Sequence, residues 1–347
     1  MRSLKHTCRF PCLRRAFCAA LALVFVLLVP VGCRKKQLTR VSFFAMDTVM
    51  DLAVYGSASV LEEAEALVFS LEKEFSVTDP GSEIFALNAA GSAELGADAS
   101  ELIRTALEYC AITDGALDIS IYPVVRAWGF TTGEYRVPSS DELAALLSSV
   151  DYTKIALDGG RVTLPENAMV DLGAVAKGYT ADRIAQLFRS KGVEGAIINL
   201  GGNVHTLGTK ADGSAWSVAV ADPFGEDYAC ILTVSDRAVV TSGGYQRYFE
   251  QDGVTYRHII DPATGLPVDN GLASVSVVSE RGVVADALST ALYVMGCDRA
   301  IEFWRKNGGF EAVFITENGE LFVTEGLESV CSPAGNYAGS EPGIVHR

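Results

Sequence analysis

The order of the predicted elements constrains this fold most, because strands gather in the second half of the chain instead of alternating with helices. After Gly192, apolar runs predict strands at 196–200, 216–221, 230–234, 254–260 and 273–278. Helical spacing returns only over 284–295 and 298–306. Strands that follow one another in this way favour an α+β fold with a mostly antiparallel or mixed sheet over a doubly wound parallel sheet.

The first half of the chain is mainly helical by pattern. A strand over 39–55, interrupted by a turn at Met46-Asp47-Thr48, precedes helical spacing over 61–75, 99–112, 143–150 and 180–190. Near the C-terminus, Asn318-Gly319 separates two short apolar runs and predicts a hairpin. The expected organisation is one domain over 40–330, followed by a loose C-terminal tail over 331–347.

Charge divides the chain into two unequal parts. The first 36 residues contain eight Lys or Arg residues and no acidic residue, while the whole chain has a formal charge of -15. Residues 37–347 therefore carry -23, and nucleic acid is not expected as a partner because its phosphates attract proteins through Lys and Arg. An anionic cofactor would need local amides, basic side chains or a metal ion to bind such a domain.

The N-terminus has the order of an export signal. Five basic residues precede an apolar run over 16–32, and Cys33 follows directly after a small residue. This predicts a lipoprotein signal peptide at 1–32, lipidation of Cys33, a linker at 33–39 and attachment to the outer face of the bacterial cell (inner) membrane. An uncleaved N-terminal helix is the alternative, and both interpretations place the domain outside the cytoplasm.

Four cysteines follow the predicted anchor, namely Cys110, Cys230, Cys297 and Cys331. They contain no C-x-x-C pair, so a zinc site is not expected. An exported protein can hold disulfides, but the spacing does not say which cysteines would pair. Cys110 and Cys297 fall in apolar helical patterns and are expected to be buried thiols.

Asp286 and Thr290 are the first candidates for chemistry. They stand four residues apart in a predicted helix and therefore share one face. A carboxylate and a hydroxyl are hard oxygen donors of the kind that Mg²⁺ prefers. The alternative is structural: an acid near a helix N-terminus, with a threonine bonded back to its own helix.

Small residues over 171–178 lead into a predicted helix start. Backbone N–H groups at such a point can approach a phosphate, and Lys177 adds positive charge. The spacing is not that of a P-loop, and Gly173 and Gly178 could equally shape a tight turn. The Gly201-Gly202 pair that ends a strand is consistent with a turn or with close backbone approach.

His258 precedes a turn rich in Asp, Pro and Gly over 261–265. Histidine is the side chain best placed to move a proton near neutral pH, although a lone strand histidine is often structural. Thr241-Ser242-Gly243-Gly244 lacks the G-x-S-x-G pattern, so a serine hydrolase is not supported.

Taken in order, these segments resemble the ApbE family of FAD:protein FMN transferases. The resemblance rests on eight stretches between about residues 40 and 300: 45–50, 75–83, 115–130, 171–178, 199–202, 241–245, 258–265 and 285–290. It implies an α+β catalytic domain of two lobes that holds FAD between them, with Mg²⁺ at the pyrophosphate.

The resemblance also implies roles for individual residues. The backbone oxygen of Ala174 and the side chains of Asp286 and Thr290 would hold Mg²⁺. The FAD-contacting positions would be Met46, Thr78, Ala116, Leu117, Asp118, Asp171, Lys177, His258 and Ile259.

The reaction implied is transfer of FMN from FAD to a threonine or serine hydroxyl of a client protein, with release of AMP. His258 is the candidate base for the hydroxyl proton, and Asp286 could share that role. The expected clients are flavin-accepting proteins of membrane redox complexes. Two alternatives stay open: an FAD pyrophosphatase that yields FMN and AMP, and an FAD-binding surface lipoprotein without catalysis.

Overall fold

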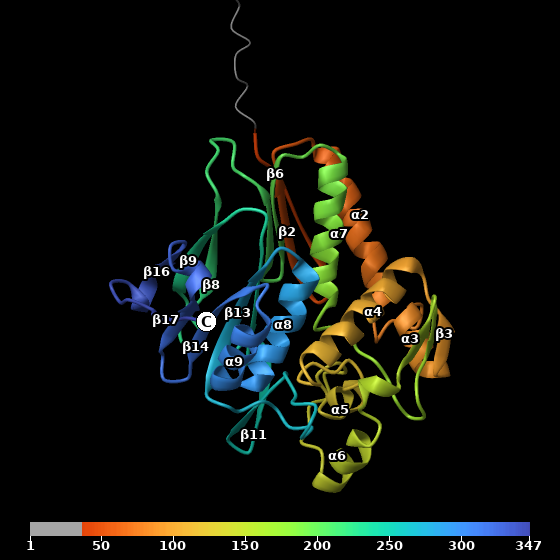
Figure 1. The fold of residues 1–347 in the computed structure, drawn as a ribbon. Helices are drawn as coiled ribbons and strands as arrows, with labels where there is room; N and C mark the ends of the chain where they lie inside the picture. The colour runs from red at the N-terminus through yellow and green to blue at the C-terminus, as the bar shows by residue number, and fades with distance from the viewer. Residues whose placement is uncertain (1–36) are drawn as a thin grey trace, which may run out of the picture. The chain divides into compact units, whose positions relative to one another are not determined.

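The computed structural model describes residues 37–347, and Leu38–Arg347 form one compact unit. The predicted signal peptide and Cys33 lie outside the described residues. The described chain combines helices with mostly antiparallel strands, which confirms the expected α+β fold (Figure 1). Among the helices over 37–347, none has the length and apolar character needed to cross a membrane.

A nine-stranded mixed sheet forms the centre of the unit. All neighbouring strands are antiparallel except the last pair, which is parallel. In spatial order the strands are β1 (Thr39–Ala45), β2 (Thr48–Val54), β6 (Gly195–Leu200), β7 (Asn203–Gly208), β10 (Ala238–Gly243), β13 (Leu272–Ser279), β14 (Glu311–Thr316), β15 (Leu321–Thr324) and β17 (Gly343–Val345).

Both faces of this sheet are buried at the central strands β10 and β13, whose successive side chains point to opposite sides. On β10, Val240 packs in the cluster shared with the helices, whereas Val239 packs against the small sheet β8 (Trp216–Ala221), β9 (Tyr228–Val234) and β16 (Cys331–Pro333). Val277 and Val278 of β13 divide in the same way. The unit is therefore layered as helices, main sheet and small sheet.

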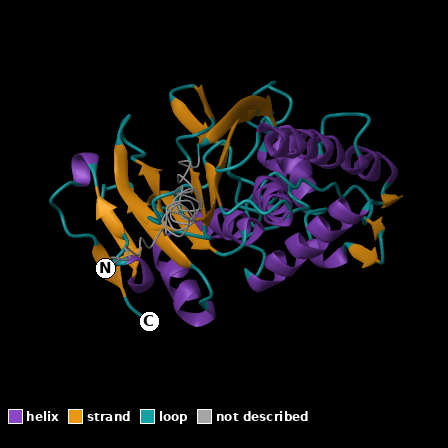
Figure 2. Cartoon of the chain, turned by 90° about the horizontal axis from the view of Figure 1, so that it is seen from above, coloured by secondary structure: helices purple, strands orange, loops and turns teal. Residues whose placement is uncertain are grey.

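Most helices gather on one side of the sheet (Figure 2). The α-helices of the described chain are α2 (Ala58–Phe75), α3 (Glu83–Ala90), α4 (Ala97–Ile112), α5 (Tyr122–Ala127), α6 (Ser140–Leu147), α7 (Ala176–Ser190), α8 (Gly282–Met295) and α9 (Cys297–Asn307). Helices α2 and α7 run side by side against β2 and β6. The sequence pattern missed α3, although Ser82 accepts hydrogen bonds from the N–H groups of Ile84 and Phe85 as an N-cap does.

Two smaller strand groups lie beside the helices. Strands β3 (Ser92–Glu94), β4 (Ala156–Asp158) and β5 (Arg161–Thr163) form one sheet, and β11 (Tyr248–Gln251) pairs with β12 (Val254–Arg257) as a hairpin. The strand expected over 254–260 ends at Arg257, although the His258 N–H still donates to the carbonyl of Arg247, the residue opposite it in the hairpin.

The expected loose tail is wrong for two of its segments. Strand β16 pairs antiparallel with β9, β17 pairs parallel with β15, and Val345 is buried. Each strand has only three residues, which are too few to show an alternating pattern in the sequence. Their extended structure depends on backbone hydrogen bonds to the neighbouring strands β9 and β15. The hairpin predicted at Asn318-Gly319 is confirmed as β14–β15.

Candidate active site

Asp286 lies at the centre of the candidate site and is almost fully buried on α8. One carboxylate oxygen accepts a hydrogen bond from the Gly178 N–H at 2.8 Å, and the other accepts from the Asn203 side chain at 2.9 Å. Burial raises the pKa of Asp286, while the Lys177 charge, Gly178 N–H and Asn203 lower it in part. Three segments far apart in sequence thus meet on one carboxylate.

Helices α7 and α8 approach closely because each has a glycine at the crossing. A Cβ on Gly178 would lie 2.3 Å from the Gly282 carbonyl oxygen, and a Cβ on Gly282 would lie 2.4 Å from the Gly178 oxygen. Helix α7 starts at Ala176, four residues before the predicted start. Gly178 therefore lies inside the first helical turn, where it allows close approach, and does not shape a loop.

The three predicted metal ligands present different oxygens. The Gly178 N–H donates to Asp286 and not to the Ala174 carbonyl four residues earlier, so that carbonyl is outside the helical ladder. Thr290, half-buried, places its hydroxyl 3.4 Å from the Ser242 hydroxyl of β10. The hydroxyl that bonds back to the α8 backbone belongs to Ser289.

A carbonyl, a carboxylate and a hydroxyl match the oxygen preference of Mg²⁺. Over residues 37–347 no group of three or more His, Cys, Asp or Glu side chains is arranged to hold a metal ion. In the expected donor set only Asp286 is of these types. Such a set fits magnesium, which takes water or phosphate oxygens as further ligands, and differs from the Cys and His ligands of zinc sites.

Lys177 links the three titratable groups predicted for the site. Its charge acts on Asp171, His258 and Asp286. Burial raises the pKa of Asp171, and the Gly173 N–H at 2.8 Å, Lys177 and Arg247 oppose that shift. Two basic side chains therefore converge on this corner of a strongly acidic domain, which provides local attraction for an anion.

His258 has a lowered pKa and a ring orientation set by the Arg247 backbone. Burial lowers its pKa to about 4, with the positive charges of Arg247 and Lys177 acting in the same direction. Its Nδ1 lies 3.0 Å from the Arg247 carbonyl oxygen. A carbonyl can only accept, so Nδ1 carries the hydrogen and Nε2 keeps its lone pair.

The predicted FAD-contacting stretch at Ala116, Leu117 and Asp118 is buried. One Asp118 oxygen accepts from the N–H and hydroxyl of Ser120 at 2.8 and 2.6 Å, and the other accepts from the Tyr152 N–H at 3.2 Å. The next carbonyl, of Ile119, accepts from the Asp171 N–H at 2.8 Å. The backbone that follows Asp118 is therefore hydrogen-bonded to the Asp171 segment.

Met46 and Ile259, two further predicted FAD-contacting residues, lie far apart in the sequence. Met46 has a φ of 48° in the β1–β2 turn, and its sulfur accepts from the Thr180 hydroxyl of α7 at 3.9 Å. Ile259, next to His258, is buried, and its carbonyl bonds the Val268 N–H at 2.9 Å. Met46 therefore contacts α7, and Ile259 adjoins His258 in sequence.

Thr78 is exposed in a turn held by the Ser76 hydroxyl, which accepts from the Thr78 N–H at 3.2 Å. The preceding carbonyl, of Val77, accepts from the Tyr122 hydroxyl at 3.4 Å. The pKa of Tyr122 is raised, chiefly by burial and also by the negative charge of Asp171. Among the described residues, no hydrogen bond joins Thr78 to Asp286 or His258.

Sequence reasoning missed three residues that complete the site. Asn203 orients Asp286, Ser242 contacts Thr290, and the Arg247 backbone and charge set the state of His258. Asn203 directly follows the Gly201-Gly202 pair and Ser242 lies in the 241–245 stretch, but nothing in the local pattern assigned either residue a partner. Arg247 lies in a polar segment without any signal of its own.

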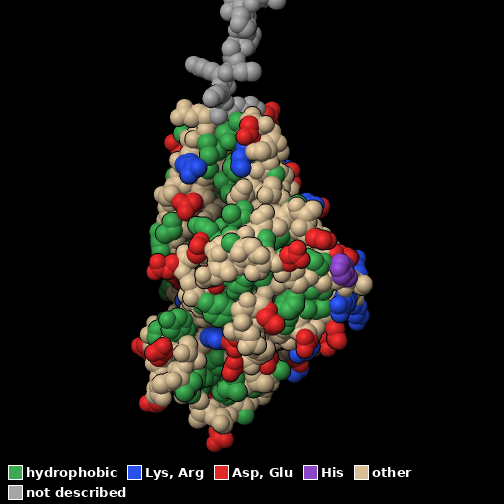
Figure 3. Space-filling view, turned by 90° about the vertical axis from the view of Figure 1, so that its left-hand side faces the viewer, with side chains coloured by type: hydrophobic (Ala, Val, Ile, Leu, Met, Phe, Trp, Pro, Cys, Tyr) green, Lys and Arg blue, Asp and Glu red, His purple; other side chains and the backbone are tan. Residues whose placement is uncertain are grey.

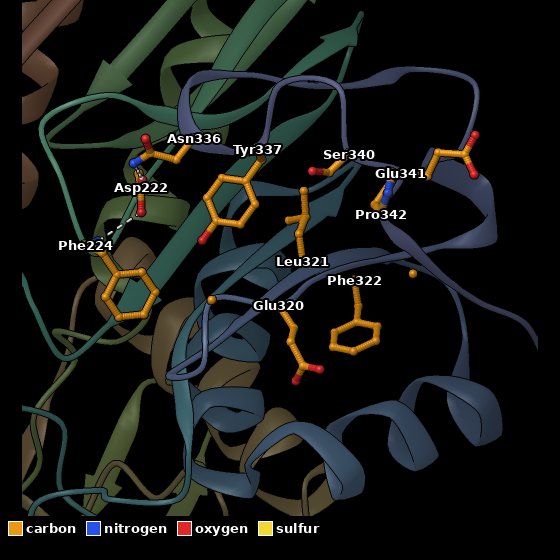
Figure 4. Close-up of a pocket in the computed structure, with 12 residues that line it drawn as sticks. Asp222, Phe224, Glu320, Leu321, Phe322, Asn336, Tyr337, Ser340, Glu341 and Pro342 are labelled. Carbon is orange, nitrogen blue, oxygen red and sulfur yellow. Dashed lines mark hydrogen bonds between the residues drawn. The ribbon is translucent and has the colours of Figure 1, made fainter.

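A cavity of about 540 Å³ lies elsewhere, between the β14–β15 turn, the 222–224 loop and the C-terminal segment. Figure 4 shows Asp222 bonded to Asn336 at its rim, with Phe224, Tyr337 and Phe322 around it. None of the predicted site residues lines it. Acidic side chains are spread over the molecular face seen in Figure 3, in keeping with the charge of the domain.

Comparison with known proteins gives a consistent result. The ApbE family model matches residues 46–314. An FAD:protein FMN transferase from Treponema pallidum is 36% identical over 290 residues, which are 78% of this chain and 80% of the relative.

Two crystal structures are similar in fold. The ApbE protein from Thermotoga maritima has a TM-score of 0.80 at 32% identity, over 85% of this chain and 99% of the other. The apo flavinyl transferase ApbE from Pseudomonas stutzeri has a TM-score of 0.78 at 27% identity, over 85% and 96%. The chain therefore belongs to the ApbE family and is an enzyme of that family.

Proposed function

We propose that this enzyme transfers FMN from FAD to a threonine or serine hydroxyl of a client protein. The observation that carries the proposal is the buried Asp286 carboxylate, held by the Gly178 N–H and the Asn203 side chain where α7 and α8 cross. The Lys177 charge acts on Asp171, His258 and Asp286. A neutral base, positive charge and oxygen donors meet there, and relatives named FAD:protein FMN transferase support the substrate.

In this proposal the client hydroxyl attacks the phosphorus on the FMN side of the FAD pyrophosphate. The new bond joins the hydroxyl oxygen to that phosphorus, and the bond to the bridging oxygen breaks, so AMP leaves with the electron pair. His258 takes the hydroxyl proton on Nε2, the nitrogen left free by the bond from Nδ1 to Arg247. Lys177 neutralises negative charge on the phosphates.

Mg²⁺ would be held by the Ala174 carbonyl, Asp286 and Thr290, and when bound it supplies charge neutralisation at the pyrophosphate. The oxygen character of these donors supports this assignment. Asn203 and the Gly178 N–H keep the Asp286 carboxylate in one orientation. In this proposal Asp286 acts as a ligand and His258 takes the proton.

We further propose that Cys33 anchors the enzyme outside the cytoplasm, where its clients would be flavin-accepting proteins of membrane redox complexes. The basic, apolar and cysteine order of the N-terminus supports this location. Labelling with radioactive palmitate, compared between the native chain and Cys33→Ala, tests the anchor. Label retained by Cys33→Ala would contradict it.

The reaction is tested by incubating the full chain with FAD, Mg²⁺ and an acceptor protein, followed by mass spectrometry of the acceptor. The expected result is an FMN adduct with an equal amount of AMP, and loss of both with Asp286→Ala but not with the exposed α9 control Asp298→Ala. Free FMN and AMP without an adduct would identify a pyrophosphatase. Bound FAD without AMP release would identify a non-catalytic binder.

A further inference from the structure

Strands β9 and β16 bring two cysteines to the same face of the small sheet. In their antiparallel register Pro333 is opposite Cys230, and Cys331 is opposite Leu232. Residues two apart on a strand share a face, so Cys331 is the diagonal neighbour of Cys230. Cys230 is buried in the cluster between the two sheets, and Cys331 packs against that cluster while half-exposed.

Each of the two thiols shifts the pKa of the other. A side-chain hydrogen bond from one to the other raises the pKa of Cys230 and lowers the pKa of Cys331. The other two cysteines differ: burial raises the pKa of Cys110 to about 12 and also raises the pKa of half-buried Cys297. Of the four, Cys331 is the half-exposed cysteine whose pKa is lowered, and access and a lowered pKa both favour reaction with a disulfide.

We propose that Cys230 and Cys331 form an intrachain disulfide when the protein meets a small-molecule or protein disulfide as oxidant. The Cys331 thiolate attacks the oxidant, forms a mixed disulfide and releases one thiolate of the oxidant. Cys230 then gives up its proton and attacks the Cys331 sulfur, which releases the second thiolate. The two cysteines together lose two electrons and two protons, and the oxidant is reduced to two thiols.

This bond would fasten the C-terminal segment to the small sheet. β16 has three residues and depends on β9 for its backbone partners, so a covalent link there replaces a weak pairing with a permanent one. The link also encloses β10, β13 and α8 in one loop, and long loops gain most from closure in the unfolded-state account of disulfides. The pair packs on the sheet face opposite the helices, so it stabilises the fold without taking part in flavin transfer.

Peptide mapping tests the pairing. The full chain is incubated in native buffer with excess oxidised glutathione, free thiols are blocked with iodoacetamide, and the protein is digested with trypsin. Cleavage after Lys and Arg places Cys230 in peptide 211–237 and Cys331 in peptide 307–347, each with no other cysteine. The expected product is these two peptides joined by a bond that a reductant breaks.

Two results would overturn the proposal: both peptides recovered unlinked, as alkylated or glutathionylated species, or either one joined to a peptide that carries any other cysteine of the chain. Thermal unfolding gives an independent measurement. Oxidised protein is expected to melt about 5 °C or more above reduced protein. Cys331→Ser should abolish this difference and Cys297→Ser should keep it, while flavin transfer stays unchanged in both; an equal shift in both variants would contradict the assignment.

Discussion

The carboxylate of Asp286 accepts the backbone N–H of Gly178 at 2.8 Å, across 108 residues of sequence. That bond joins α8 to the first turn of α7 and withdraws the Gly178 N–H from the Ala174 carbonyl. The contact between α7 and α8 therefore involves two of the proposed metal ligands, Asp286 and the Ala174 carbonyl. Changes at the helix crossing should affect stability and catalysis together.

Gly178→Ala tests the crossing. The added Cβ would lie 2.3 Å from the Gly282 oxygen and 2.7 Å from the Asp286 Cβ, so the helices must separate. Overpacking of this kind costs about 1–3 kcal/mol of unfolding free energy, and transfer activity should fall steeply as the carboxylate moves. Gly225→Ala is the control, because its Cβ meets no atom closer than 3.7 Å. Denaturant unfolding and adduct formation measure both effects; equal behaviour of the two variants would refute the close-packing account.

Asp286→Asn should separate function from stability. Burial raises the pKa of Asp286 above its usual 3.8, so the ionised form is less favourable in the folded than in the unfolded protein. This cost appears as pH rises through the folded pKa and is absent well below 3.8. An amide can still accept from Gly178, and Asn203 can turn its oxygen to meet the new donor.

We therefore expect EDTA-treated Asp286→Asn to melt no lower than the wild type near neutral pH, about pH 7, while transfer falls by about 100-fold or more. Melting curves recorded between acidic and neutral pH should converge for the two proteins at low pH. A clear loss of stability in the variant at neutral pH would show that the charge itself holds the site together.

The pH dependence of transfer should reveal His258. The pKa of His258 is lowered to about 4. We therefore expect kcat/KM to stay constant as the pH falls below the usual pKa of histidine, and to decrease only at more acidic pH. Removing the Arg247 charge with Arg247→Met should move the acidic limb upward, whereas Arg189→Met, on an exposed arginine, should not. His258→Ala should lower transfer by about 100-fold or more with FAD still bound. Full transfer by that variant would exclude His258 as the base.

Asp182→Ala should weaken the start of α8. The Asp182 carboxylate accepts from the Gly282 and Val283 N–H groups at 2.5 and 3.1 Å, as an N-cap would, and its charge raises the pKa of Asp286. Loss of such a cap costs about 0.5–2 kcal/mol. Asp182→Asn keeps an acceptor and should recover part of that loss, as measured by denaturant unfolding. Equal stability of all three proteins would show that this contact does not stabilise the helix.

The sequence predicted the elements whose patterns are local. Helix α4, strand β8 and the β14–β15 hairpin lie where spacing and turn residues placed them, and Asp286 and Thr290 do share the face of α8. Helix α3 was missed, and α7 begins earlier than expected, because Ala176, Lys177 and Gly178 have no apolar spacing of their own. Their helical form depends on packing against α8.

The site residues carried over from the family resemblance stay predictions, but the structure adds the partners that local pattern could not supply. The bond from Asn203 to Asp286 spans 83 residues, and the thiol contact of Cys230 and Cys331 depends on two strands that pair only in the folded chain. Periodicity records which side of an element is apolar, so it reveals helices, strands and faces. It does not say which distant element packs against that side. The burial of His258 and Asp286, and the effect of the Lys177 charge on their pKa values, arise only from that packing.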